Sequence, residues 1–308
     1  MADNLTGGAT SAGLPALERA RPRLPAWLTT ALSFLALLLL LSALWEGYKL
    51  LGAATGGHIP FTALPLPIRS DDKSMPHLTR ILAALLRPAQ RGNETTLLVI
   101  LLRSAWFTWR EALAGFITGS LIGIALGAVF GRSTLLERGL MPYVVASQTV
   151  PLLAIAPMIV IWGSRLAWPA WMSVALISTY LTFFPVTINT LRGLRSPDPT
   201  ALELMRSYAA SEWQILFKLR LPAALPYIFA ALKVSASASV IGAIIGELPS
   251  GIADGLGRSL LTFSYYYISG PEKLYAAILV AAVVGIAFAL AVMLAERLVL
   301  PPERRLAE

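Results

Sequence analysis

Long apolar runs recur along the chain and are separated by more polar stretches. An apolar helix of about 20 residues is long enough to cross the hydrocarbon core of a bilayer. We predict six such helices, over residues 27–51, 111–130, 141–162, 167–191, 222–245 and 274–298. The pattern therefore predicts an all-α integral membrane protein with six transmembrane helices and with both termini on the same side of the membrane.

The polar segments between these runs suggest how the chain is organised. Residues 1–25 are rich in Gly, Ala and Pro and are predicted to form a flexible tail, residues 26–300 a single transmembrane domain, and residues 301–308 a second tail. The first apolar run is longer than the 7–15 residues or so that are usual in a signal peptide, so an uncleaved helix is expected. The polar stretch 52–104 contains a predicted short amphipathic helix over residues 77–86.

Glycines recur every fourth residue in the second predicted span, at Gly115, Gly119, Gly123 and Gly127, and Gly131 continues the series. This spacing keeps them on one face of a helix, where the missing side chains allow another helix to approach closely. We therefore predict a helix-packing seam. The alternative is the generally high glycine content of membrane helices.

The composition supports the membrane assignment and narrows the chemistry. The chain is 56% hydrophobic and 14% charged, whereas a soluble domain has about a quarter charged residues. Its net charge is +8, and because the basic residues flank apolar runs we assign them to membrane topology and not to nucleic acid. With no cysteine, two histidines and no Gly-Lys pair for a phosphate-binding loop, we expect no metal site, no cofactor and no catalytic site in this chain.

Loop charges predict the orientation. Residues 192–221 carry Arg192, Arg195, Arg206, Lys218 and Arg220, whereas residues 246–273 carry only Arg258 and Lys273. Basic loops stay in the cytoplasm. Both termini and the loop 196–221 are therefore expected to be cytoplasmic.

The loop 196–221 has a helical pattern of its own. Thr200 with Glu203, and Ser211 with Gln214, each fit a capping box, in which a hydroxyl residue and an acid or amide three positions later bond to each other's backbone. We predict helices over 201–208 and 212–220 that meet at Ala209, with Pro222 opening the fifth span. The hairpin also presents apolar side chains: Leu204, Met205, Tyr208, Trp213 and Phe217. Such a surface is typical of a docking site for a cytoplasmic partner.

This loop resembles the cytoplasmic loop of the permeases of binding-protein-dependent ABC importers. Glu203 matches the glutamate of their Glu-Ala-Ala motif, Leu204-Met205 stand at the two alanines, Ala209 stands at the glycine, and Leu221-Pro222 match the closing pair. The family glycine allows a positive φ, which would cost an alanine about 1 kcal/mol. Either the junction is strained at Ala209 or the two helices bend differently.

The resemblance extends over residues 20–300 or so. The segment QTVPLLAIAPMIVIWGS fits the nitrate, sulfonate and taurine group of these permeases. The segments ELMRSYAASEWQI and SGPEKLYAAI are most similar to permeases for riboflavin and for the pyrimidine precursor of thiamine. The resemblance implies a homodimer in a bacterial membrane, in contact with lipid. It also implies two cytoplasmic ATPase subunits that hold ATP and magnesium, and an extracytoplasmic substrate-binding protein.

A few polar side chains inside the predicted spans are candidates for the substrate pathway, since such residues are rare there and are often functional. They are Gln148, Tyr180, Lys233 and Glu247. Pro151 and Pro157 should loosen the helix that contains Gln148. Lys233 could instead extend to the membrane surface, and Glu247 could form a gate or an ion pair.

Riboflavin is the substrate we favour, with the pyrimidine or a sulfonate- or nitrate-type anion as alternatives. A transporter of another class, driven by an ion gradient, would be expected to contain an inverted internal repeat. No convincing repeat is found in the sequence.

Overall fold

The computed structural model describes residues 26–60, 62, 64–89 and 94–301. They fall into two compact units, divided after Ser70, which are described separately. The predicted tail 1–25 lies outside the described residues, and so does the predicted tail 301–308 except for residue 301. Every regular element in the described part of the chain is helical, which confirms the all-α prediction.

The first unit consists of the long helix α1 (Ala26–Ala54) and the loop that follows it. The Tyr48 hydroxyl donates to the carbonyl of Ile68 at 2.9 Å and accepts from the Ile68 amide at 3.1 Å. These bonds hold the end of the loop against α1. The predicted first span is therefore confirmed as one helix that is long and apolar enough to cross a membrane.

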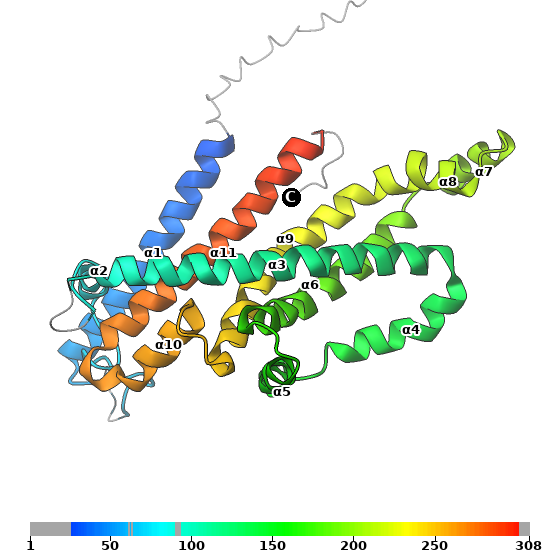
Figure 1. The fold of residues 1–308 in the computed structure, drawn as a ribbon. Helices are drawn as coiled ribbons and strands as arrows, with labels where there is room; N and C mark the ends of the chain where they lie inside the picture. Colours follow the sequence, from blue (N-terminus) through cyan, green and yellow to red (C-terminus); the bar gives the residue numbers. More distant parts are fainter. Residues whose placement is uncertain (1–25, 61, 63, 90–93, 302–308) are drawn as a thin grey trace, which may run out of the picture. The chain divides into compact units, whose positions relative to one another are not determined.

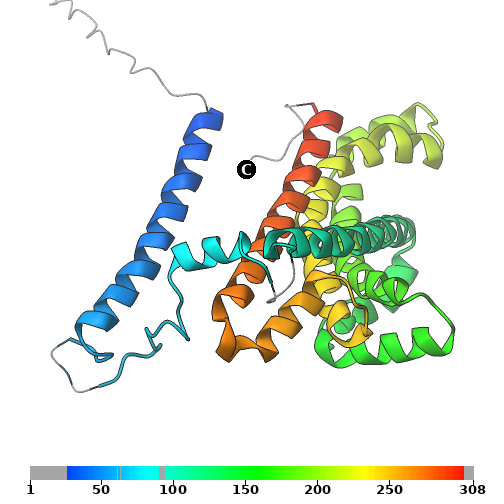
Figure 2. The ribbon, with the colours of Figure 1, turned by 60° about the vertical axis from the view of Figure 1, so that its left-hand side comes forward.

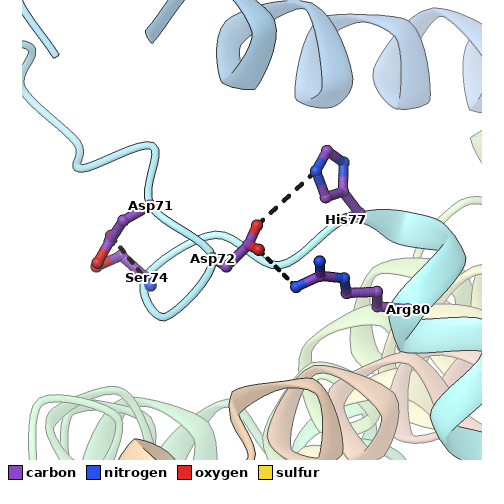
Figure 3. A network of polar contacts seen from close by, with 5 residues as sticks. All are labelled: Asp71, Asp72, Ser74, His77 and Arg80. Carbon is purple, nitrogen blue, oxygen red and sulfur yellow. Dashed lines mark hydrogen bonds and ion pairs between the residues drawn. The ribbon is translucent and has the colours of Figure 1, made fainter. Parts of the chain in front are cut away.

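The second unit begins with a polar turn that leads into the short helix α2 (Leu78–Leu85), as predicted. Figure 3 shows Asp72 between two basic side chains, with Arg80 at 2.5 Å and His77 at 3.8 Å. The turn is fixed to later parts of the chain through the carbonyl of Ser74, which accepts from the hydroxyls of Tyr267 at 3.2 Å and Tyr275 at 2.7 Å. Segments nearly 200 residues apart are thus joined at this end of the unit.

Helix α3 (Leu97–Arg132) is 36 residues long and packs along α6 (Ala170–Leu194). The predicted start of this span at residue 111 was too late. The preceding residues continue the helix because Leu97 and Leu101 are buried in an apolar cluster with α2, α10 and α11. Helix α3 therefore extends well beyond the length that a bilayer requires.

The predicted glycine seam is confirmed at the contact between α3 and α6. A Cβ atom added to Gly119 would lie 2.6 Å from the Cβ of Thr182, and one added to Gly123 would lie 2.8 Å from the Cβ of Val186. These separations are too short for real carbon atoms. The glycines are required by the close approach of the two helices.

The third predicted span is not one helix. It is divided into α4 (Thr134–Ser147) and α5 (Leu152–Arg165), which are bent by 99° (Figure 1). Pro151 has no backbone N–H to continue the first helix, and it begins the second instead. The described residues therefore contain five helices that could each cross a membrane, or six spans if this bent pair is counted as one.

The remaining helices complete a bundle around α6. After α6 come α7 (Pro199–Ser207), α8 (Glu212–Ile215), a π-helical turn (Leu216–Arg220), α9 (Leu221–Ser250), α10 (Leu256–Tyr265), a 3₁₀ turn (Tyr267–Ser269) and α11 (Pro271–Val299). Helix α9 packs on a neighbouring side of α6, again through glycines: Gly242 faces the backbone of Ser178, the residue that also meets Gly115 of α3. Figures 1 and 2 show the α7–α8 hairpin at one end of this unit.

The seam predicts opposite effects for two glycine substitutions. Gly123→Ala should destabilise the protein by about 1–3 kcal/mol, because the new methyl group forces α6 away. Gly285→Ala, in α11, should be neutral or slightly stabilising, since nothing lies within 4 Å of its Cβ position and alanine favours the helix. Thermal unfolding of the purified chain in detergent measures both. Equal shifts in Tm for the two variants would contradict the seam.

Candidate functional site

The hairpin after α6 begins differently from the prediction. Asp198, and not Thr200, caps α7, and its carboxylate accepts from the Thr200 amide at 2.7 Å. Pro199 explains the difference, because its fixed φ and missing N–H suit the first helical position. The predicted Thr200–Glu203 capping box is therefore wrong. Glu203 is exposed and makes no hydrogen bond or ion pair with the described part of the chain.

The bend of the hairpin is strained at Ala209, the residue that stands at the family glycine. Its φ is +52°, in the left-handed region that favours glycine. The amide of Ala210 bonds to the carbonyl of Met205 at 3.0 Å, and the amide of Ala209 bonds to that of Arg206 at 2.9 Å. This pair of bonds is a Schellman motif, which ends a helix and reverses the chain. Of the two possibilities drawn from the sequence, the strained junction is the one observed.

The second half of the hairpin starts with the predicted capping box. The backbone amide of Gln214 donates to the Ser211 hydroxyl at 3.3 Å, and the backbone amide of Ser211 donates to the side-chain oxygen of Gln214 at 2.8 Å. A π-helical turn joins α8 to α9, and α9 begins at Leu221 with Pro222 in its first turn, as predicted. The wider π-helical turn just before Pro222 accommodates a ring that would otherwise clash with the carbonyl four residues earlier.

The hairpin exposes a continuous set of apolar side chains. Leu204 is 57% exposed, Tyr208 79%, Trp213 61% and Phe217 58%, whereas Met205 is half-buried. The rings of Trp213 and Phe217 stack with centroids 6.0 Å apart. Large exposed apolar groups on both arms of a hairpin, beside an unpaired carboxylate, are typical of a protein-docking surface.

Two of the predicted pathway residues lie together at the break between α4 and α5. Gln148 is exposed and follows the last residue of α4. The Tyr180 hydroxyl, from α6, donates to the carbonyl of Ser147, immediately before Gln148. Tyr180 therefore holds the end of the broken helix, where Gln148 is presented.

Lys233 lies apart from these residues, on α9. Its ammonium group forms an ion pair with Glu296 of α11 at 3.1 Å, and the glutamate is buried. Sequence reasoning missed Glu296, although an acidic residue inside the last apolar run was a visible signal. The pair neutralises a charge that would otherwise be costly inside the membrane.

Glu247 is fully buried near the other end of α9, where it joins three helices. Its carboxylate accepts from the Thr108 hydroxyl of α3 at 2.6 Å and from the Gly257 amide at the start of α10 at 2.5 Å. Gly257 is required there, because a Cβ would lie 2.9 Å from the Cβ of Glu247. The described residues offer Glu247 no basic partner, so the N-terminus of α10 and a hydroxyl satisfy it in place of an ion pair.

Glu111 is a second buried carboxyl group that the sequence analysis did not single out. It lies one turn beyond Thr108 on α3, close to Glu247, and is 2% exposed. Its carboxyl group interacts with that of Glu247, and neither of its oxygens reaches another donor with good hydrogen-bond geometry among the described residues. It lines a cavity of about 210 Å³ with Arg110 and Trp171. The predicted span began at Glu111, which placed this residue at the end of a helix and not inside one.

Comparisons with known proteins agree with this arrangement. A chain of the MetNI methionine ABC transporter, in an inward-facing conformation, superposes with a TM-score of 0.56 at 17% identity, covering 67% of this chain and 98% of that chain. At this identity the likeness shows a shared fold.

Two curated relatives are more similar in sequence. The formylaminopyrimidine transport permease protein ThiX of Halalkalibacterium halodurans is 34% identical over 61% of this chain and 72% of its own length. The riboflavin transport system permease protein RibX of Chloroflexus aurantiacus is 32% identical over 49% of this chain and 54% of its own length, so the match spans about half of that relative.

A family model matches residues 119–304, from the glycine seam through the hairpin to the end of α11. It is described as the inner membrane component of binding-protein-dependent transport systems. The match covers more than half of the chain, and the chain belongs to this family of multi-pass membrane permeases.

Proposed function

We propose that this chain is the permease subunit of an ATP-driven importer and works as a homodimer. Two ATPase subunits dock on the α7–α8 hairpins, and an extracytoplasmic binding protein delivers the substrate. The observation that carries the proposal is the hairpin itself, with Glu203 unpaired, Trp213 and Phe217 exposed, and the bend fixed at Ala209. Membership of a binding-protein-dependent transport family supports the same assembly.

In this proposal the hairpin couples ATP hydrolysis to movement of the membrane helices. The chain stays helical from Glu212 through the π-helical turn to Ser250, so a displacement of α8 is passed on to α9. Closing of the ATPase pair would draw two hairpins together and rotate α9 in each copy. Gln148, at the break beside Tyr180, then lies on the proposed substrate pathway.

The substrate we propose is riboflavin, with the thiamine-precursor pyrimidine as the alternative. A nitrate or sulfonate ion would require positive potential along its path. Lys233 is neutralised by Glu296, and Glu247 and Glu111 form a buried acidic region. A neutral ring with amide and amine edges suits hydrogen-bonding partners such as Gln148 and Tyr180 better than an anion does.

Substrate identity is tested by growth of a riboflavin-requiring bacterial strain on limiting riboflavin. Expression of the chain with its ATPase and binding protein should restore growth, and Gln148→Ala should reduce uptake of labelled riboflavin about tenfold, the effect of losing one well-placed hydrogen bond. Uptake of the formylated pyrimidine or of a sulfonate, without riboflavin uptake, would contradict the riboflavin assignment and leave the permease role intact.

Coupling is tested at two positions of the hairpin. Glu203→Lys should insert normally and lose ATPase co-purification, because a capping role is absent and only the docking surface changes. Ala209→Asp should do the same, since aspartate tolerates a left-handed conformation better than most residues and the change acts through charge. Ala209→Gly should retain coupling and stabilise the turn by about 1 kcal/mol.

The control for these variants is Glu94→Lys, which makes the same charge change at an exposed residue before α3. Membrane abundance, ATPase co-purification and substrate-stimulated ATP hydrolysis are measured for each protein. Wild-type transport by both Glu203→Lys and Ala209→Asp would mean that another surface carries the coupling.

Orientation is tested with reporter fusions. A reporter fused after Arg305 should be active in the cytoplasm, and one inserted near Asp72 should be active outside. This follows from the five basic residues at 192–221, which favour a cytoplasmic hairpin. The reverse result would place the hairpin on the side without ATP.

A further inference from the structure

A cavity of about 580 Å³ lies where α3 and α6 end beside the hairpin. Its polar wall is formed by Arg132 at the end of α3, Glu212 and Trp213 at the start of α8, and Arg220 just before α9. Its remaining wall is apolar and includes Val129. The proposed coupling function does not use this cavity.

Arg220 carries an unmatched charge in this cavity. Its Nε atom is buried and has no hydrogen-bond acceptor, and the guanidinium forms no ion pair within the described residues. Arg195, nearby in the sequence, shows the usual solution, since its guanidinium binds both carboxylate oxygens of Glu137. A buried donor left without an acceptor is rare in folded proteins and calls for a specific explanation, such as a bound ion.

Arg132 adds a second positive group. Its guanidinium carbon lies 5.6 Å from the centre of the Trp213 ring, in a cation–π contact, and it forms no ion pair in the described part of the chain. Its position in the last turn of α3 also complements the helix dipole. Glu212 reaches the same cavity but pairs with neither arginine. The cavity therefore holds two unpaired guanidinium groups against one carboxylate.

The chemistry of the walls identifies the ligand class. Guanidinium groups bind phosphate oxygens with two parallel hydrogen bonds, and two of them suit a single phosphodiester. The apolar wall extends along the ends of two membrane helices through Ala128, Val129, Leu194 and Leu216, which suits an acyl chain and not a soluble anion.

We propose that Arg132 and Arg220 bind the phosphate of an anionic phospholipid beneath the coupling hairpin. Trp213 covers the headgroup, and the apolar wall receives the start of one acyl chain. The lipid thereby fills the angle between α3 and α8 and supports the hairpin at its base. Trp213 belongs both to this site and to the proposed docking surface, whereas Arg132 and Arg220 line the cavity and Glu203 and Phe217 do not.

The test measures lipid binding to the purified, delipidated full-length chain by native mass spectrometry. The probes are short-chain phosphatidylglycerol, phosphatidylcholine with the same chains, and glycerol phosphate. Phosphatidylglycerol should bind most tightly. Arg220→Gln and Arg132→Gln should each weaken its binding about tenfold, whereas Lys218→Gln should not, because this exposed residue carries the same charge and does not line the cavity. Arg220→Lys should fall between these values.

The outcomes separate the possible occupants. Unchanged phosphatidylglycerol binding in both arginine-to-glutamine variants would overturn the proposal, and so would an equal loss in Lys218→Gln. Glycerol phosphate binding as tightly as the lipid would assign the cavity to a soluble phosphate. Loss of ATPase co-purification with unchanged lipid binding would assign the arginines to the protein partner. Because Arg132 and Arg220 lie on different helices, misfolding of one variant leaves the other as the test.

Discussion

The close approach of α6 to its two neighbours is the constraint on which this structure depends. Glycines of α3 and glycines of α9 face neighbouring sides of α6, and both sets reach Ser178, so α6 touches backbone along most of its length. In a lipid environment such contact replaces the hydrophobic effect as the source of helix association. It also sets the direction in which the chain leaves α6 for the hairpin, and thus where a docking surface can be presented.

The buried charged side chains of the bundle each have a different kind of partner. Lys233 has a carboxylate partner, whereas Glu247 has a hydroxyl and the amide of a helix N-terminus. Glu111, also buried, has the carboxyl group of Glu247 itself as its neighbour. The helices that surround the proposed pathway therefore offer little fixed positive charge to a passing molecule.

Much of this arrangement was predictable from sequence where a local pattern is strong. The four-residue glycine spacing specified one helix face, and Ser211 with Gln214 specified a cap, because both signals act within a single turn. The prediction failed where two local signals competed. Thr200 and Asp198 could both cap α7, and the proline between them decided for Asp198. Partners far apart in the chain, such as Thr108 and Glu247, have no local signal, because only tertiary packing brings them together.

The length of α3 has a mechanical consequence. Its 36 residues measure about 54 Å, against about 30 Å for the hydrocarbon core of a bilayer. One end is embedded among α2, α10 and α11, and the other reaches the cavity beside Trp213. No proline interrupts it, so it behaves as a stiff rod. Because α3 is continuous and packed along α6, a tilt at its α2 end would move Arg132 at the other end together with α6.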